Sequence, residues 1–320
     1  MDTIQDKGRY GYGNWGINPG GTMDPFASQV ANVLVGNSCG EAVLELHFPG
    51  PQIIFEHTSL ICITGADFTP MLDDEPLPLW QPVVVRRNAA LYFEQVQWGA
   101  CCYVAIHGGF AINKWLNSYS TNLKAEAGGW KGRRLEKGDR LCLNENQIYF
   151  AGWLKADHVY TALPWRPDVK NVYEHPREIY VLPGNEWQQL AAPSQKDFLK
   201  NEFTIQPSSD RMGYHLKGSP LKLELPVELI SSAVSFGTIQ LLPNGQMVVL
   251  MADHQTTGGY PRIGHVISAH LPKMAQLRPG DSIQFAMTNI ATAEELLLSQ
   301  QQELKIIGRS CEDHLKQLVC

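Results

Sequence analysis

The sequence predicts a mainly β protein built from barrels or sandwiches. Its 28 glycines and 20 prolines divide the 320 residues into short apolar runs, and few segments carry the start signals of a helix. Runs of this length, bounded by turn-forming residues, are typical of strands. The runs that we expect to form strands are residues 42–47, 59–64, 101–107, 178–182, 235–242, 246–252 and 282–286.

Two helices are indicated by their first residues. Asp24 is a good N-cap, and Pro25 follows it at the first helical position, so we expect a helix over residues 26–35 that ends at Gly36. The second signal is a capping box at residues 292–295, directly before three leucines.

The chain is long enough for two domains, each with its own core. The polar, proline-bearing stretch 164–176 is the expected boundary, giving an N-terminal domain of residues 1–175 and a C-terminal domain of residues 176–320. Short motifs also recur in the same order in both halves. The pairs are Arg9-Tyr10-Gly11-Tyr12 with Arg211-Met212-Gly213-Tyr214, Gly128-Gly129-Trp130 with Gly258-Gly259-Tyr260, and Gly138-Asp139 with Gly280-Asp281. Glycine motifs recur by chance, so the sequence leaves an internal duplication open.

Charge and composition exclude several classes of protein. The net charge of -6 argues against the basic surface that a nucleic acid requires. No apolar run approaches the roughly 20 residues of a membrane span, and the acidic N-terminus is unlike a signal peptide, so we expect a cytoplasmic protein. The seven cysteines and ten histidines show no spacing typical of disulfide frameworks or metal sites. We therefore expect reduced thiols and no bound metal.

The strongest local indication of a site is the stretch 253–261, which follows an apolar strand. A carboxylate, an amide and two hydroxyls emerge there beside two glycines, whose backbone a ligand can approach closely. Such a group suits a small polar molecule with a carboxylate or amide, whereas the alternative is a tight turn with local hydrogen bonds. The expected catalytic residues are Asp253, Thr256 and Thr257. The expected substrate-binding residues beside them are Gln255, Gly258, Gly259 and Tyr260.

Three further clusters each allow a structural or a binding role. Asp210 and Arg211 are adjacent, so the arginine is either part of an internal ion pair or a clamp for an anion. The loop through Gly20, Gly21 and Asp24 leads into a helix N-terminus, where anions bind, or is simply a capped helix entry.

The basic loop 128–134 is the third cluster. Its Arg133 is positioned either to close over an anion or to lie in a solvated hairpin. The loop lacks the spacing of a phosphate-binding Walker A motif.

Taken together, several motifs resemble one known family. Residues 3–12 resemble its T-V-Q-D-x-G-R-x-G-Y, residues 20–24 its S-G-A-M-D, and residues 31–37 its A-N-x-L-V-G-N. Residues 209–214, 237–240, 253–261 and 275–281 also match in order. The chain thus resembles, over residues 3–290, the family of the 5-oxoprolinase C subunits, also called KipA, allophanate hydrolase subunit 2 or biotin-dependent carboxyltransferase-like proteins.

The resemblance implies a fold of two tandem cyclophilin-like β-barrels. It implies ATP-dependent opening of the 5-oxoproline lactam to glutamate, together with A and B subunits, the latter KipI-like, and with ATP bound by or with a partner. Related domains carry out biotin-dependent carboxyl transfer, and other members are regulators that capture a partner without chemistry. On the same resemblance, Ser120 and Thr121 join the expected substrate-binding residues.

A lactam is hard to open because its amide is resonance-stabilised and its nitrogen leaves poorly. We expect Thr256, Thr257 and the N–H groups of the following glycines to bind carbonyl or carboxylate oxygens. Asp253 is expected to orient the substrate nitrogen or to act as a general base.

The sequence also departs from the family pattern. Tyr119, Cys101 and His215 stand where the family has arginines, which favours the regulatory alternative slightly. The strand that the family places before T-V-Q-D is nearly absent. Either the chain begins further upstream, or another segment such as the tail 306–320 fills its place.

Overall fold

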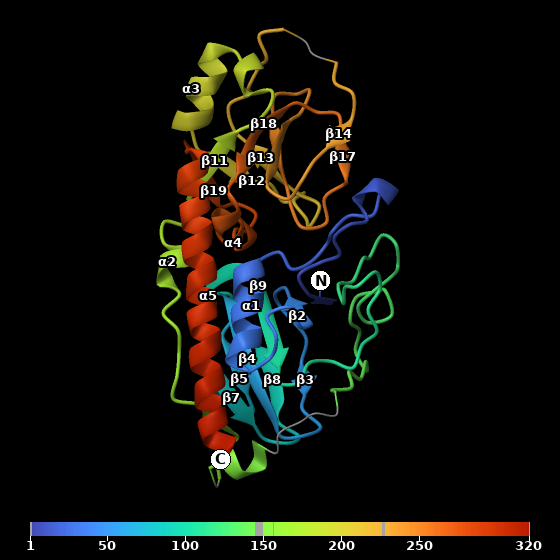
Figure 1. Cartoon of the computed structure of the whole chain (residues 1–320), viewed down its shortest axis with the longest axis vertical. Helices are drawn as coiled ribbons and strands as arrows, with labels where there is room; N and C mark the ends of the chain where they lie inside the picture. Colours follow the sequence, from blue (N-terminus) through green and yellow to red (C-terminus); the bar gives the residue numbers. More distant parts are fainter. Residues whose placement is uncertain (1, 145–149, 156, 226–227, 320) are drawn as a thin grey trace. The chain divides into compact units, whose positions relative to one another are not determined.

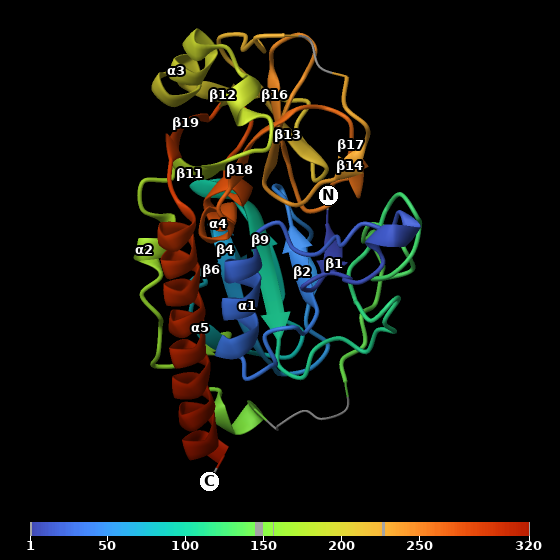
Figure 2. The ribbon, with the colours of Figure 1, turned by 45° about the horizontal axis from the view of Figure 1, so that its top comes forward.

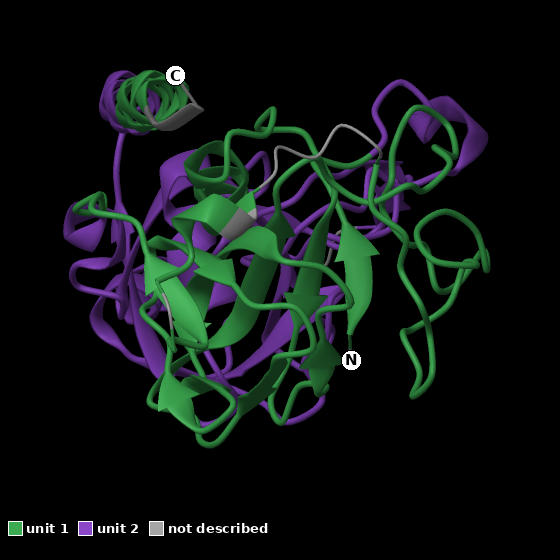
Figure 3. Ribbon diagram, turned by 90° about the horizontal axis from the view of Figure 1, so that it is seen from below, with its two compact units in different colours: residues 1–8, 24–168, 301–320 green, residues 9–23, 169–300 purple. Residues whose placement is uncertain are grey.

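A computed structural model of the chain describes residues 2–144, 150–155, 157–225 and 228–319. They form two compact units, coloured separately in Figure 3: residues 1–8, 24–168 and 301–320 in the first, and residues 9–23 and 169–300 in the second. The boundary after residue 168 falls inside the expected stretch 164–176. However, the units are not the simple division at residue 175 that the sequence suggested, because segments from both ends of the chain join the opposite unit.

The first unit is made mainly of strands, with helix α1 and the second part of the long C-terminal helix (Figure 1). Its elements are β1 (Thr3–Gln5), α1 (Pro25–Leu34), β2 (Val43–Leu46), β3 (Ile53–Ile54), β4 (Ser59–Asp67), β5 (Pro70–Leu72), β6 (Glu75–Pro76), β7 (Pro82–Val85), β8 (Ala90–Phe93), β9 (Trp98–Ile106), a 3-10 turn at Phe150–Trp153 and β10 (Tyr160–Ala162).

Two sheets enclose the core of this unit. One has six strands in the order β1-β2-β9-β4-β7-β10, and the other has four in the order β3-β8-β5-β6. Cys102 and Val104 of β9 point into the core between them. Helix α1 lies across β4 and β9, as Figure 2 shows. Its start agrees with the sequence, since the Asp24 carboxylate accepts the N–H of Ala27 at 2.9 Å and Pro25 is the first helical residue.

The second unit contains a closed barrel. Its strands follow the order β11-β18-β15-β16-β13-β12-β19. The elements are a 3-10 turn at Gly13–Trp15, α2 (Lys170–Tyr173), β11 (Glu178–Pro183), a 3-10 turn at Trp187–Gln189, α3 (Ala192–Lys200), β12 (Phe203–Ile205), β13 (Gly213–Lys217), β14 (Ser232–Ala233), β15 (Thr238–Leu241), β16 (Met247–Leu250), β17 (Thr257–Gly258), β18 (Arg262–Val266), a 3-10 turn at Ser268–His270, α4 (Leu271–Ala275) and β19 (Ser282–Met287).

The mainly β fold with few helices is therefore confirmed, and each of the seven expected strands is present. One difference is β15, which begins three residues later than expected. The backbone turns before it, since the N–H of Ser235 donates to Thr238 Oγ1 at 3.1 Å and Gly237 has a φ of 89°. A positive φ of this kind is suited to glycine and ends regular strand geometry.

The last helix, α5 (Ile290–Val319), begins earlier than the expected capping box. Asn289 is its cap, because Asn289 Oδ1 accepts the N–H of Thr292 at 3.0 Å. The tail 306–319 is helical and packs on α1: Cys311 Sγ donates to the carbonyl of Leu34 at 3.0 Å. The tail is therefore not a strand beside β1, which pairs with β2 at the edge of its sheet. None of the described helices has the length and apolar character needed to cross a membrane.

Candidate functional site

A buried ion pair in the second unit joins two of the predicted site residues. Arg211 lies just before β13, and Asp253 follows β16, which is paired with β13. Arg211 Nε donates to Asp253 Oδ2 at 2.7 Å, and its Nη2 donates to Asp253 Oδ1 at 3.1 Å. The side chains are 7% and 20% exposed. Such a two-point contact fixes the plane of the carboxylate and leaves one lone pair on each oxygen for a further donor.

The same guanidinium holds the predicted glycine loop. Arg211 Nη2 donates to the carbonyl of Gly21 at 2.6 Å. A side chain at Gly20 would come within 3.0 Å of Arg9 Nη1 and 3.5 Å of Asp253 Oδ1, so the loop requires glycine where it passes these groups. Gly20, Gly21, Arg211 and Asp253, which lie far apart in the sequence, therefore meet in one cluster.

Arg9 is a member of this cluster that the sequence analysis did not select. It is 1% exposed, and its N–H donates to the carbonyl of Pro19 at 2.7 Å. The signal for it was present, because the repeated motif R-x-G-Y pairs Arg9 with Arg211. Both arginines of that repeat belong to the second unit.

Asp210 has a local role instead. Its Oδ1 accepts the N–H groups of Met212 at 2.8 Å and Gly213 at 3.2 Å, closing the turn before β13. The ion-pair partner of Arg211 is thus Asp253, and not the adjacent Asp210.

The rest of the predicted stretch 253–260 forms one side of a short ribbon. Strand β17, with Thr257 and Gly258, pairs with β14, and the carbonyl of Thr256 accepts the N–H of Val234 at 3.2 Å. The residues exposed along this ribbon are Gln255, Thr257, Gly259 and Tyr260. Thr257 and Gly259 therefore face solvent, Thr256 and Gly258 are half-buried, and Asp253 is anchored by Arg211.

Beneath the ribbon lies a polar layer that the sequence analysis missed. Gln240 and Thr238 of β15 are buried there, next to His265 of β18 and His254. Thr238 Oγ1 lies 3.3 Å from His265 Nδ1, and Gln255 Nε2 donates to Gln240 Oε1 at 3.5 Å. The available signal was the family-like motif at residues 237–240, where threonine and glutamine alternate with apolar residues.

Burial favours the neutral form of both histidines in this layer. Burial lowers the pKa of His254, and burial together with the nearby His254 lowers the pKa of His265. His254 Nδ1 donates to the carbonyl of Gln255 at 2.6 Å, because a carbonyl only accepts. Its Nε2 therefore carries the lone pair.

Four predicted site residues lie in the first unit and serve its architecture. Asp24 caps α1. Ser120 Oγ donates to Asp6 Oδ1 at 2.6 Å, and Thr121 Oγ1 donates to the carbonyl of Ile4 at 2.9 Å; both side chains are buried. Arg133 makes a two-point contact with Asp139 at 2.8 and 2.7 Å, and its guanidinium holds the pKa of that carboxyl well below its usual range.

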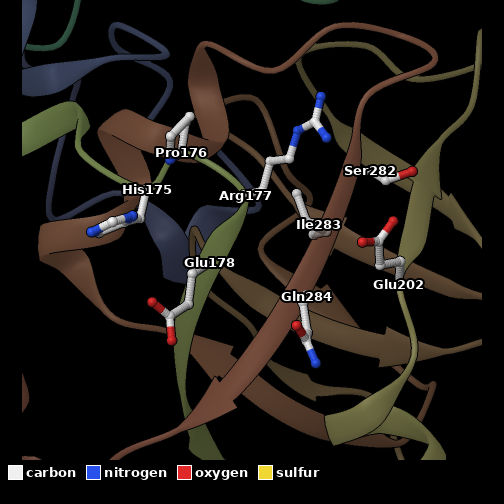
Figure 4. A pocket seen from close by; sticks show the side chains of 8 residues that line it. All are labelled: His175, Pro176, Arg177, Glu178, Glu202, Ser282, Ile283 and Gln284. Atoms are coloured by element: carbon white, nitrogen blue, oxygen red, sulfur yellow. The ribbon is translucent and has the colours of Figure 1, made fainter.

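A shallow hollow of about 410 Å³ lies elsewhere on the second unit, along β11 and β19. Figure 4 shows its lining, with Glu178, Glu202 and Gln284 around it. These three side chains are exposed, and no predicted site residue is among the eight that line the hollow. We therefore assign the site to the cluster around Asp253 and the adjoining ribbon.

Comparison with known proteins places this arrangement in a family. The model of the carboxyltransferase domain, subdomain A and B, matches residues 15–287. The chain is 36% identical to the C subunit of 5-oxoprolinase from Haemophilus influenzae, over 97% of this chain and 96% of that protein. It is 34% identical to the C subunit of 5-oxoprolinase from Escherichia coli, over 94% of this chain and 92% of that protein.

Among solved structures, the urea amidolyase of K. lactis is similar with a TM-score of 0.85 and 26% identity, over 96% of this chain. This chain spans 19% of that longer protein. The residues that the family model matches include Arg211 and Asp253, the ribbon and the layer beneath it. The chain belongs to the carboxyltransferase domain family, subdomain A and B.

Proposed function

We propose that this chain is the C subunit of a 5-oxoprolinase, which opens the 5-oxoproline lactam to glutamate. The observation that carries the proposal is the identity of 36% and 34% to two proteins of that name, over nearly the whole length of each chain. Within the chain, the 253–258 stretch supplies the groups that such a substrate requires: a fixed carboxylate, hydroxyls and an approachable glycine backbone.

Asp253 is best suited to orienting the substrate. Its two oxygens are held by Arg211, so the carboxylate keeps a fixed direction and retains one lone pair on each oxygen for a further donor at the site. A carboxylate bound at two points by a guanidinium is a poor proton acceptor, which favours orientation over general-base catalysis. The exposed hydroxyl of Thr257 is positioned to donate to a substrate oxygen.

The proposed reaction requires ATP, which activates the lactam carbonyl. At the glycine loop the Arg211 guanidinium is already bound within the chain, to Asp253 and to the carbonyl of Gly21, and so does not offer a free cation for a nucleotide phosphate. We therefore assign nucleotide binding to the A and B subunits, with the KipI-like B subunit as the direct partner. This chain then contributes the lactam-binding groups.

Co-expression with the cognate A and B subunits tests the proposal. Tagged chain is expected to co-purify with a B-type subunit, and the complex is expected to release glutamate from 5-oxoproline only when ATP is present. A complete complex that binds ATP but forms no glutamate would contradict the proposed activity.

Carboxyl transfer from biotin is a second candidate, favoured by the carboxyltransferase family match and the likeness to urea amidolyase. It requires a separate biotinylated carrier protein. If this chain and such a carrier carboxylate urea but do not open the lactam, the function is carboxyl transfer. Stable capture of the KipI-like partner with neither reaction would instead select the regulatory alternative.

A further inference from the structure

The carboxamide of Gln240 is buried in the second unit, with one of its two polar ends unpaired within the part of the chain that the structure describes. Gln240 alternates with Ile239 along β15, so its side chain lies on the face beneath the β14–β17 ribbon. It is 1% exposed. Its Oε1 has one long contact, at 3.5 Å from Gln255 Nε2, and its Nε2 has no hydrogen-bond partner among the described residues.

An unsatisfied amide of this kind is rare in a native core. The carboxamide has two polar atoms, Oε1 and Nε2, but only one contact within the described ranges. Flipping the amide by 180° exchanges these atoms and still leaves one of them without a partner there. A second glutamine shows what a structural role looks like. Gln246 Oε1 accepts the N–H of Gly218 at 3.1 Å, and its Nε2 donates to the carbonyl of Gly218 at 3.2 Å. Gln240 has no such arrangement within the described chain.

Gly258 covers the amide directly. A side chain at this position would come within 2.3 Å of Gln240 Nε2, so any residue other than glycine would displace the amide from its place beneath β17. The ribbon that carries Gly258 is held to β14 by two residue pairs, Ser232 with Gly258 and Ala233 with Thr257. Few hydrogen bonds therefore need to break before Gln240 meets a ligand that enters at the exposed Gln255 and Thr257.

The titratable groups described around the amide are uncharged by preference or paired. Burial lowers the pKa of His254 and of His265, which favours the neutral form of each. Arg262, which is opposite Gln240 in the strand register, makes a two-point contact with Glu186 at 3.1 and 3.0 Å. The group that Gln240 accommodates is therefore neutral, and it must offer both a donor and an acceptor.

We propose that Gln240 recognises the cis-amide edge of the substrate, with its Oε1 accepting the substrate N–H and its Nε2 donating to the substrate carbonyl. A lactam ring forces its amide to be cis, so N–H and C=O lie side by side and match a carboxamide at two points. Urea presents the same edge, which agrees with the likeness to urea amidolyase. This assignment rests on the proposed function and names the specificity-determining residue of that site.

The test compares Gln240→Met with the matched control Gln246→Met in the reconstituted complex. Gln240→Met removes an unsatisfied amide at similar volume, so the melting temperature should stay equal or rise, while KM for 5-oxoproline should rise roughly 10- to 100-fold because two hydrogen bonds to the substrate are lost. Gln246→Met should lower the melting temperature and leave KM unchanged.

Selectivity gives a readout that a structural role would not change. The lactone analogue of 5-oxoproline has a ring oxygen in place of the N–H. The wild-type complex should prefer the lactam strongly, and Gln240→Met should lose most of this preference. A wild-type KM and preference in Gln240→Met, or a loss of stability as large as that of Gln246→Met, would overturn the assignment.

Calorimetry on the full chain with 5-oxoproline, and separately with urea, distinguishes this inference from the proposed function. If the complex releases no glutamate but the chain binds an amide that Gln240→Met no longer binds, the assignment holds and the function fails. If glutamate is formed equally well by wild type and Gln240→Met, the function holds and the assignment fails.

Binding should also protect the backbone N–H groups of residues 255–259 from hydrogen exchange. Unchanged exchange despite binding would contradict recognition beneath the ribbon.

Discussion

Asp139 and Asp281 close the same turn in the two units. Each carboxylate Oδ2 accepts the N–H of the residue three positions earlier at 2.8 Å, and each N–H donates back to the carbonyl of that residue at 3.0 Å. The glycines before them have φ values of 93° and 94°. The recurring Gly-Asp motif of the sequence is thus a recurring structure, which supports an internal duplication of the chain.

Replacement of Asp253 with alanine should lower both stability and activity. The buried Arg211 guanidinium would lose its counter-charge. Breaking such a pair costs about 3 kcal/mol. Thermal unfolding of Asp253→Ala should show this loss, together with loss of glutamate release by the complex.

The double variant Asp253→Ala with Arg211→Met is the control for this effect. It removes both charges, so its loss of stability should be clearly smaller than the sum of the two single losses. Additive losses would mean that the two side chains do not stabilise each other.

Thr257→Ala should reduce lactam opening at least tenfold with little change in stability. The side chain is exposed on β17, and surface substitutions of this kind usually alter stability by less than about 0.5 kcal/mol. Thr58→Ala, a half-buried threonine of the first unit, is the matched control. Normal activity in Thr257→Ala would make the 253–260 stretch a turn without a catalytic role.

Ser120→Ala should destabilise the first unit. Ser120 Oγ donates to Asp6 Oδ1 at 2.6 Å and accepts the N–H of Asp6 at 2.9 Å in a buried setting, so its removal leaves polar groups unpaired at a cost of about 1–3 kcal/mol. Urea unfolding measures the loss, with the exposed Ser38→Ala as a control. An unchanged unfolding midpoint, with weakened substrate binding, would restore the binding role that the sequence suggested.

His270 should make the protein sensitive to acid. Burial, with a smaller contribution from Lys273, lowers the pKa of His270 to about 3, and its Nδ1 accepts the N–H of Tyr180 at 2.9 Å. The ordinary pKa near 6.5 applies when the chain is unfolded, so between these values the unfolded state binds the extra proton. This group alone should therefore lower the free energy of unfolding by about 1.4 kcal/mol for each pH unit below 6.5.

Urea unfolding between pH 4 and pH 8 measures this dependence. His270→Asn retains an acceptor for Tyr180 without the titration, so its stability should fall less steeply in acid. Parallel pH profiles for the variant and the wild type would show that His270 does not titrate on unfolding.

The sequence predicted the strands and α1 well because their signals are local. Asp24 and Pro25 specify the start of α1 through neighbours along the chain. The division into units was not predictable in the same way, since it depends on contacts such as Arg211 with Gly21 that join distant segments. Gln240 was missed because the alternation of polar and apolar residues at 237–240 marks one face of a strand, but does not show that the polar face is buried or that the amide lacks a partner.

The candidate site was also predictable only where the signal is local. Motifs selected Asp253 and Arg211, but only the folded chain shows that they bind each other. Ser120 and Arg133 lie in polar loops that resemble ligand-binding loops in sequence. In the structure they bind Asp6 and Asp139, so their role is structural. No spacing rule in the sequence distinguishes a structural role from ligand binding.

The bond between Arg211 and Gly21 spans 190 positions of the chain, which has a consequence during synthesis on the ribosome. Residues 9–23 emerge well before the rest of their unit, which is made of residues 169–300. At a synthesis rate of about 5–20 residues per second, Arg211 is added roughly 10–40 s after Gly21. Nascent chains halted before residue 211 should therefore leave this segment open to proteases, and those released after residue 300 should protect it.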